Sequence, residues 1–228
     1  MAATQPSAFN LMSVTIACAL FFCAKSLSAD DHAEYDTLIQ KTFWGDLYKG
    51  GGFTFYTKKP FSSKGPLITE SHIYSTSWIQ DHLQCGTNRQ CKRESPEYLK
   101  IISDLHNIVP ANSKLSFKIK ESFFGQLDNS IPKDEFGFRK MQHIVEPEDD
   151  VKGDIARAIF YMRDTYQLPI LGFIDDLKRW NMGDPPSTEE LQRNNAIEKI
   201  QGTRNPYIVE TVPKIMDKPT AQNTNLNK

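Results

Sequence analysis

The residues of this sequence whose types are best suited to chemistry lie between Glu70 and Lys120. His72 ends a short segment of apolar and polar residues, 67–72, that is typical of a β-strand. An imidazole titrates near neutral pH and can take a proton from water, so His72 could act as a general base. A histidine with a satisfied hydrogen bond in the core or at the surface is the alternative, and the bare sequence leaves both open.

A second polar cluster is formed by Asp104, His106 and Asn107, in the segment DLHN. Carboxylate, imidazole and amide groups can together hold a metal ion. The same residue types also form capping and turn networks, and Pro110 follows as a turn signal. Either a metal cluster or a capping network is compatible with this segment.

The N-terminal segment is predicted to be an export signal. Residues 11–24 (LMSVTIACALFFCA) form an apolar run that is shorter than the ~20 residues a bilayer span needs. The small residues of 26–29 (SLSA) follow it, as at a cleavage site. We therefore expect residues 1–29 to be removed and the mature chain to reside in the periplasm, at the outer membrane or outside the cell. The alternative is a buried N-terminal helix.

Cysteine usage agrees with export. Cys18 and Cys23 lie in the expected signal, which leaves Cys85 and Cys91 in the mature chain. Oxidising compartments form and keep disulfides, so two cysteines that close a short loop in an exported chain favour a disulfide bond. A two-thiolate metal site would need more ligands than this loop offers.

The elements that must position these residues are mostly helical. Residues 33–48 are predicted to form a helix, and the glycines of 50–52 a turn before an alternating strand over 53–56. Apolar residues recur at helical spacing over 154–166, and again at Phe173, Leu177 and Trp180.

A further helix is expected over residues 187–200. It opens with Ser187, which can accept a hydrogen bond from the amide of Glu190 while the Glu190 side chain reaches back to the start of the helix.

Composition limits the class of protein. The chain has 228 residues, of which 39% are apolar and 24% charged, which is globular and neither disordered nor collagen-like. The formal net charge of −1 shows no overall preference for nucleic acid or membranes, so any such binding must be local. We expect one domain over residues 30–212 and a disordered polar tail over 213–228.

Seven segments, in order along the chain, resemble the endonuclease I family of exported bacterial nucleases, which belongs to the ββα-metal (His-Me finger) class. They are residues 43–44 (FW), 51–56 (GGFTFY), 72–78 (HIYSTSW), 103–111 (SDLHNIVPA), 152–162 (KGDIARAIFYM), 180–186 (WNMGDPP) and 197–207 (IEKIQGTRNPY). The resemblance implies an α+β fold: a mostly helical single domain around a ββα-metal finger, with a small β element.

The resemblance also implies roles for individual residues. In the family, a histidine at a strand end deprotonates water, a divalent cation stabilises charge on the phosphate, and an arginine holds the phosphate. His72 matches the histidine, and Arg89, within the cysteine loop, is the candidate for the arginine.

The metal ligands of the family are missing. They are a Glu immediately before the histidine and an Asn on the following helix, and these positions are occupied here by Ser71 and Ser116. Ser75 also replaces the usual Pro. A neutral hydroxyl is a poor ligand for Mg²⁺. Glu70 is one residue from the ligand position, but a shift of one along a strand points the side chain to the opposite face.

Lysine and arginine side chains could offer phosphate contacts without a metal. Between Cys85 and Lys120 there are seven Lys or Arg and three acids, a local charge of +4. A solvated basic face is the alternative. The candidate nucleic-acid contacts are Arg89, Lys92, Arg93, Lys114, Lys118 and Lys120.

The sequence therefore favours a catalytically impaired or inactive relative of the nucleases that needs no cofactor. Such a protein would bind envelope protein partners, for which a secretion-type assembly is one setting. The alternative is an active exported DNA/RNA endonuclease with an altered metal site, which would use Mg²⁺.

Overall fold

The computed structural model of the chain describes residues 35–170 and 172–210. The expected export signal, its cleavage site and the polar tail lie outside these residues. No helix in the described part is long and apolar enough to cross a membrane.

A ββα unit lies at the centre of the fold. Strands β3 (Ile68–His72) and β4 (Ile108–Asn112) pair antiparallel, with His72 opposite Ile108. The chain passes directly from β4 into α5 (Ser113–Ile119), because the Asn112 side chain accepts hydrogen bonds from the amides of Lys114 and Leu115 and so caps the helix. This unit is the finger that the resemblance implies.

The segment between the two strands of the finger is helical. It contains α2 (Thr76–Leu83), α3 (Asn88–Glu94) and α4 (Pro96–Ile102). Hydroxyl side chains at the three N-caps, Ser75, Thr87 and Ser95, each accept a backbone N–H. A disulfide joins Cys85 to Cys91 across the turn from α2 to α3, as the cysteine count predicts.

The described N-terminal part confirms the expected helix and corrects the expected strand. Residues 35–37 are α-helical and continue into the π-helical segment η1 (Leu38–Leu47). The strand predicted over 53–56 is wrong beyond its first residue, since β1 (Gly52–Phe53) pairs only with β2 (Pro60–Phe61). The Thr54 hydroxyl accepts a hydrogen bond from the backbone amide of Lys59, and the chain forms a turn at this point.

A glycine is required where β1 begins. Gly51 has φ +81°, and a Cβ there would lie 2.1 Å from the carbonyl oxygen of Phe61. Only a residue without a side chain allows this approach of the two strands.

A three-stranded sheet follows the finger. It consists of β5 (Phe123–Phe124), β7 (Ile144–Glu146) and β6 (Arg139–Met141) in that order, with β7 parallel to β5 and antiparallel to β6. The short 3₁₀ helix η2 (Asp149–Val151) then leads into the longest helix.

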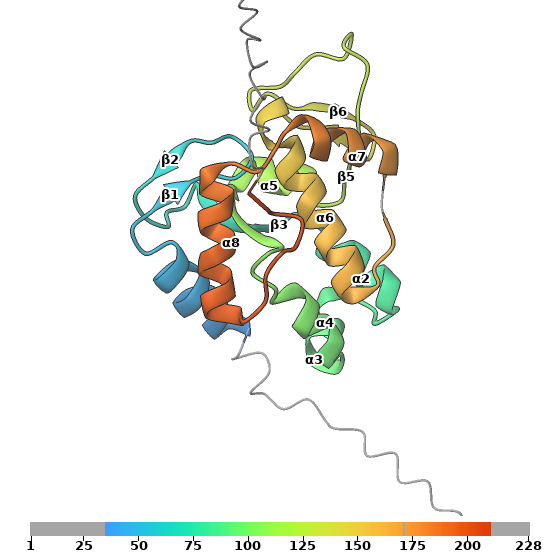
Figure 1. Ribbon diagram of the computed structural model, residues 1–228. Coiled ribbons are helices and arrows are strands. Elements are labelled where there is room, and N and C mark those ends of the chain that lie inside the picture. Colours follow the sequence, from blue (N-terminus) through green and yellow to red (C-terminus); the bar gives the residue numbers. More distant parts are fainter. Residues whose placement is uncertain (1–34, 171, 211–228) are drawn as a thin grey trace, which may run out of the picture.

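Three helices complete the α+β fold, in agreement with the predicted class. Figure 1 shows α6 (Lys152–Tyr166) running diagonally through the middle of the molecule, with α7 (Ile174–Gly183) across its upper end and α8 (Thr188–Gln201) at its side. All residues of α6 up to Met162 are buried, and they pack in one core with apolar residues of the finger and α4.

The expected cap of α8 is half right. Ser187 accepts the amide of Glu190 at 3.1 Å. The Glu190 carboxylate does not reach back to the cap, because it accepts from Arg157 of α6 instead, at 2.8 and 2.6 Å.

Candidate functional site

His72 ends strand β3 with its imidazole half-buried against α4. Its Nε2 lies 2.9 Å from the carbonyl oxygen of Ile102. A carbonyl only accepts, so Nε2 carries the proton and Nδ1 keeps its lone pair. Burial lowers the pKa of His72, although the Ile102 carbonyl and the charge of Glu70 oppose this. The ring is therefore neutral at pH 7, which is the form that a general base requires.

The two predicted ligand positions meet on the other face of the strand. Ser71 is 6% exposed, and its Oγ accepts a hydrogen bond of 2.9 Å from the Oγ of Ser116, on α5. Two residues far apart in sequence are thus brought together across the finger, where the family has a Glu and an Asn. The two positions that the family resemblance assigned to the metal ligands therefore lie next to each other in the fold.

The oxygen atoms at this point do not fit Mg²⁺. Both hydroxyls are neutral, and Mg²⁺ prefers carboxylate or carbonyl oxygens in a near-octahedral array. The buried phenol of Tyr56 is a third oxygen near Ser71. Burial raises its pKa, with partial opposition from the Ser71 hydroxyl, so it too is uncharged. Within residues 35–170 and 172–210, no group of three or more His, Cys, Asp or Glu side chains could hold a metal ion.

Glu70 does not replace the missing carboxylate. It lies on the opposite face of β3 from Ser71, as strand alternation predicts, and accepts a hydrogen bond of 3.2 Å from Nε1 of Trp44. Lys64 lies 3.7 Å from the same carboxylate oxygen. Ser75, at the usual proline position, caps α2 and donates to the carbonyl oxygen of Lys120 at the end of α5.

The DLHN segment forms a buried hydrogen-bond network. The Asp104 carboxylate accepts from Tyr161 at 2.8 Å and from Tyr166 at 2.6 Å, which ties the finger to α6. Asn107 accepts the amide of Tyr74 and donates to its carbonyl oxygen, which fixes the chain just after His72. These contacts support the capping and turn interpretation of the segment, since its polar groups are used to hold the finger in place.

Arg89 is exposed on α3, within the disulfide loop, and forms no ion pair with another described residue. Lys92, one turn later on the same helix, is close enough to contribute to the lowered pKa of His72. Arg89 lies one turn before Lys92 on the surface of α3. This placement is compatible with its predicted phosphate contact.

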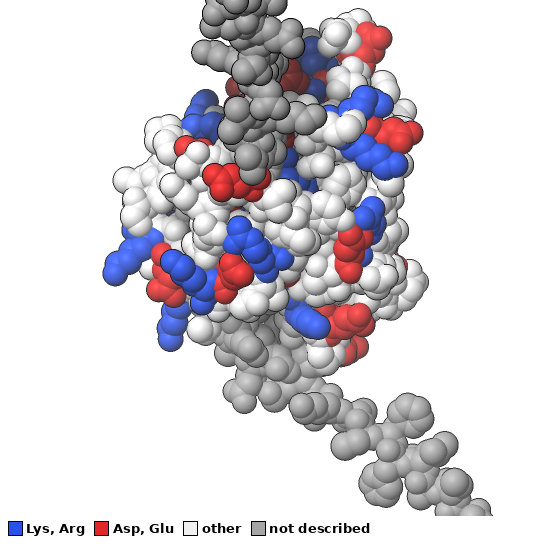
Figure 2. Space-filling view, viewed as in Figure 1, with Lys and Arg blue, Asp and Glu red and all other residues white. Residues whose placement is uncertain are grey.

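The rest of the predicted basic region is largely neutralised. Lys114 pairs with Glu135 at 2.6 Å, and Lys118 pairs with Asp134. On the side of the molecule formed by α6, α7 and α8, Figure 2 also shows acidic and basic side chains next to one another. The other contacts are Arg93 with Glu94, Lys120 with Glu121 at 3.7 Å, and Lys92 at 4.2 Å from the Tyr35 ring centre.

One feature of the site and one of the buried core could not be predicted from the sequence. Tyr56, expected in a strand, lies beside Ser71 because the chain turns after β1. Arg157, in the predicted helix over 154–166, is fully buried and binds Glu190 of α8. An arginine within an otherwise apolar helix segment is the signal that could have indicated a buried ion pair.

Comparisons with known proteins agree with this geometry. Residues 53–212 match the family model of Endonuclease I. The chain is 32% identical over 133 residues to Endonuclease-1 of Buchnera aphidicola subsp. Acyrthosiphon pisum, which covers 54% of this chain and 50% of the relative. It is 28% identical over 163 residues to a periplasmic deoxyribonuclease of Aeromonas hydrophila, covering 67% and 68%.

An extracellular ribonuclease of Bacillus amyloliquefaciens is 30% identical over 125 residues, covering 46% of this chain and 43% of that protein. The chain thus spans about half the length of the Endonuclease-1 relative. Together with the ββα finger and its histidine, the matched residues show that the chain belongs to the endonuclease I family.

Proposed function

We propose that the chain is a non-catalytic member of the endonuclease I family, retained for its fold and surface as a binding or structural component of the bacterial cell envelope. The observation that carries this proposal is the hydrogen bond between Ser71 and Ser116, which occupies the place of the family's two metal ligands.

The pair of hydroxyls supplies no charge to attract a divalent cation. The two serine hydroxyls also form a hydrogen bond with each other, so neither requires a metal ion or other ligand as a partner. A general base alone contributes roughly 10²–10⁴-fold to a reaction, far less than phosphodiester hydrolysis requires. Since Lys114 and Lys118 are already paired with acids, no free cationic side chain on α5 takes over the role of the metal.

The proposed compartment is outside the cytoplasm. The names of the relatives describe periplasmic and extracellular nucleases, and the predicted signal over residues 1–29 and the Cys85–Cys91 disulfide agree with export. The proposed partners are envelope proteins.

A second candidate function is an active nuclease with an altered metal site. The hydrogen bond from His72 to Ile102 favours it, because it leaves Nδ1 of a neutral imidazole free to accept a proton. The printed names of the relatives include both deoxyribonucleases and ribonucleases, so DNA and RNA would both be tested as substrates.

Cleavage assays on the purified chain separate the two functions. Supercoiled plasmid and a structured RNA are incubated with Mg²⁺, with Mn²⁺ and with a chelator, using wild type, His72→Ala and His82→Ala. His82 is an exposed histidine on α2 and serves as the matched control. We expect all three proteins to remain at background under every condition. Cleavage that is stimulated by Mg²⁺ and lost only in His72→Ala would refute the non-catalytic function.

A further inference from the structure

A cavity of about 650 Å³ lies between α8, the β1–β2 region and the N-terminal half of α6. Its volume falls within the roughly 300–1,000 Å³ of small-molecule sites in proteins. None of His72, Ser71 and Ser116 lines it, so it is separate from the candidate nuclease site.

The charged side chains around the cavity are mostly acidic. Five carboxylates and two cationic side chains line it. Of the two cations, Lys58 pairs with Asp154 at 2.9 Å, whereas the Arg193 guanidinium donates to the carbonyl oxygens of Leu105 and Ile108 rather than to an acid. The carboxylates are Asp150, Asp154, Asp184, Glu189 and Glu190.

Two of these carboxylates are available to a ligand. Asp150 and Glu189 are exposed, and neither forms an ion pair with any residue that the structure describes. Arg157, beneath the cavity, already binds Asp154 and Glu190. The negative charge at the cavity is therefore incompletely compensated.

The remaining wall is apolar. Phe53, at the rim, is 57% exposed. Ile73, Ala158, Ala196 and Ile208 line the interior. A ligand with an apolar or aromatic body would bury this surface.

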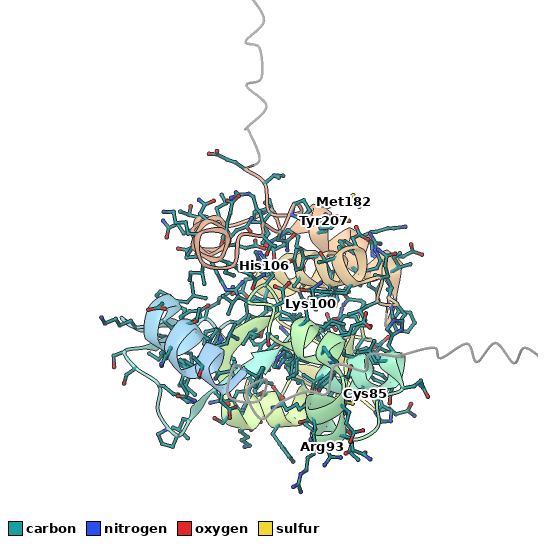
Figure 3. The ribbon with its side chains drawn as sticks, turned by 90° about the horizontal axis from the view of Figure 1, so that it is seen from below. Cys85, Arg93, Lys100, His106, Met182 and Tyr207 are labelled. Carbon is teal, nitrogen blue, oxygen red and sulfur yellow. A yellow bond between two sulfur atoms is a disulfide. The ribbon has the colours of Figure 1, made fainter. Side chains whose placement is uncertain are left out.

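An unsatisfied polar atom belongs to the same wall. His106 is only 2% exposed and lines the cavity, and Figure 3 shows it between α8 and the body of the molecule. Its Nε2 donates to the carbonyl oxygen of Thr203 at 3.1 Å, and its Nδ1 has no hydrogen-bond partner among the described residues. Burial lowers the pKa of His106, so Nδ1 is a lone-pair acceptor. A buried acceptor without a donor is rare in proteins.

We propose that this cavity binds a small organic cation, with an ammonium or guanidinium group carried on an apolar or aromatic body. The cation would lie against the carboxylates, one of its N–H groups would donate to Nδ1 of His106, and its body would pack on Phe53 and the apolar wall. The cation comes either from a free amine or from the basic side chain of a polypeptide. The inference does not depend on whether the chain cleaves nucleic acid.

Binding should depend on pH through Glu190. Burial raises the pKa of Glu190 to about 7, in spite of Arg157. The other charged groups around it are Asp154 of α6, Asp184 and Lys58, together with Glu189 and Arg193 of its own helix. Because Glu190 loses its proton as the pH rises through 7, a cation should bind more tightly at pH 8 than at pH 6.

Calorimetry on the whole chain tests the proposal. The probes are phenethylammonium, the neutral 2-phenylethanol and Nα-acetyl-arginine amide, the last representing a polypeptide side chain. A charge-assisted hydrogen bond contributes about 1.5–3 kcal/mol, so we expect the ammonium to bind at least tenfold more tightly than the alcohol. Tighter binding of the arginine derivative than of phenethylammonium would identify a polypeptide as the source.

Variants locate the binding site. Ala196→Trp should fill the cavity and abolish binding, and Glu189→Gln should weaken it. Glu97→Gln, an equal charge change at an exposed position on α4, should have no effect. In the wild type, the ¹⁵N resonance of His106 Nδ1 should move when phenethylammonium is added, which keeps the test valid if Ala196→Trp does not fold. Equal affinity for the ammonium and the alcohol, no binding of either cation, or an unmoved resonance would each overturn the proposal.

Discussion

The replacement of Arg157 by Met should strongly destabilise the domain. The Arg157 side chain is 0% exposed, and its guanidinium binds Glu190 through two hydrogen bonds of 2.8 and 2.6 Å. It also donates to Asp154 at 2.8 Å and to the carbonyl oxygen of Asp184 at 2.6 Å. One side chain thus joins α6 to α8 and to the turn before α8.

The size of the effect follows from the carboxylates that remain. Removal of one partner of a buried ion pair costs about 3–5 kcal/mol, because the other charge is left buried without compensation. Lys58 still pairs with Asp154, and Glu190, whose pKa burial already raises to about 7, can take up a proton. We therefore expect the free energy of unfolding to fall by about 3 kcal/mol, near the lower end of this range. Such a loss lowers Tm by roughly 10 °C in a domain of this size.

Urea unfolding followed by circular dichroism at pH 7 measures this loss. Arg163→Met is the matched control, since Arg163 lies on the same helix and pairs with the exposed Asp164 at the surface. Surface pairs are worth about 0–1 kcal/mol, so the control should unfold almost as the wild type does. A loss below about 1 kcal/mol in Arg157→Met would refute the reasoning that this buried network holds α8 to α6.

Four further predictions follow from the same structure. Replacement of Cys85 and Cys91 by Ser should reduce stability by about 2 kcal/mol without abolishing folding, as measured by urea unfolding beside a thiol count. Asn112→Ala should cost about 1 kcal/mol through loss of the α5 cap in the same assay. Because burial raises the pKa of Glu190 from 4.5 to about 7, the folded state holds a proton that the unfolded state has released between these values. Stability should therefore fall as pH rises from about 5 to 7, and Glu190→Gln should flatten this slope in Tm measured against pH. His72→Ala should leave the binding role unchanged, which pull-down of envelope proteins with both forms would check; a loss of partners would contradict it.

The sequence predicted the parts of the fold that depend on local pattern. The helix over 154–166 has apolar residues at helical spacing, and the structure places it there as α6. The strand that ends at His72 also agrees with β3. The local hydrogen bond at Ser187 explains why that helix start could be predicted.

The parts that failed depend on contacts that the local hydrophobic pattern does not contain. The strand expected over 53–56 ends at Phe53 because Thr54 binds Lys59 and the chain turns. The Glu190 carboxylate does not bind the start of its own helix, because it accepts hydrogen bonds from Arg157, thirty-three positions earlier in the sequence. The first contact is a local turn that the alternation of residues 53–56 does not reveal, and the second joins two helices.

The site residues were predicted from the resemblance to the family rather than from a local sequence pattern. Ser71 and Ser116 are forty-five positions apart in the sequence. Only their match to the two metal-ligand positions of the family indicated that they would face each other. The structure adds that their hydroxyls are in hydrogen-bond contact.

Restoration of the two ligands is the most direct test of the central claim. Mg²⁺-dependent nicking of supercoiled plasmid is measured for wild type, Ser71→Glu, Ser116→Asn and the double variant. We expect that only the double variant gains activity, because carboxylate and amide oxygens then face each other across the finger, whereas one ligand alone binds Mg²⁺ weakly. A wild type already as active as the double variant would contradict the claim that the finger has lost its metal site.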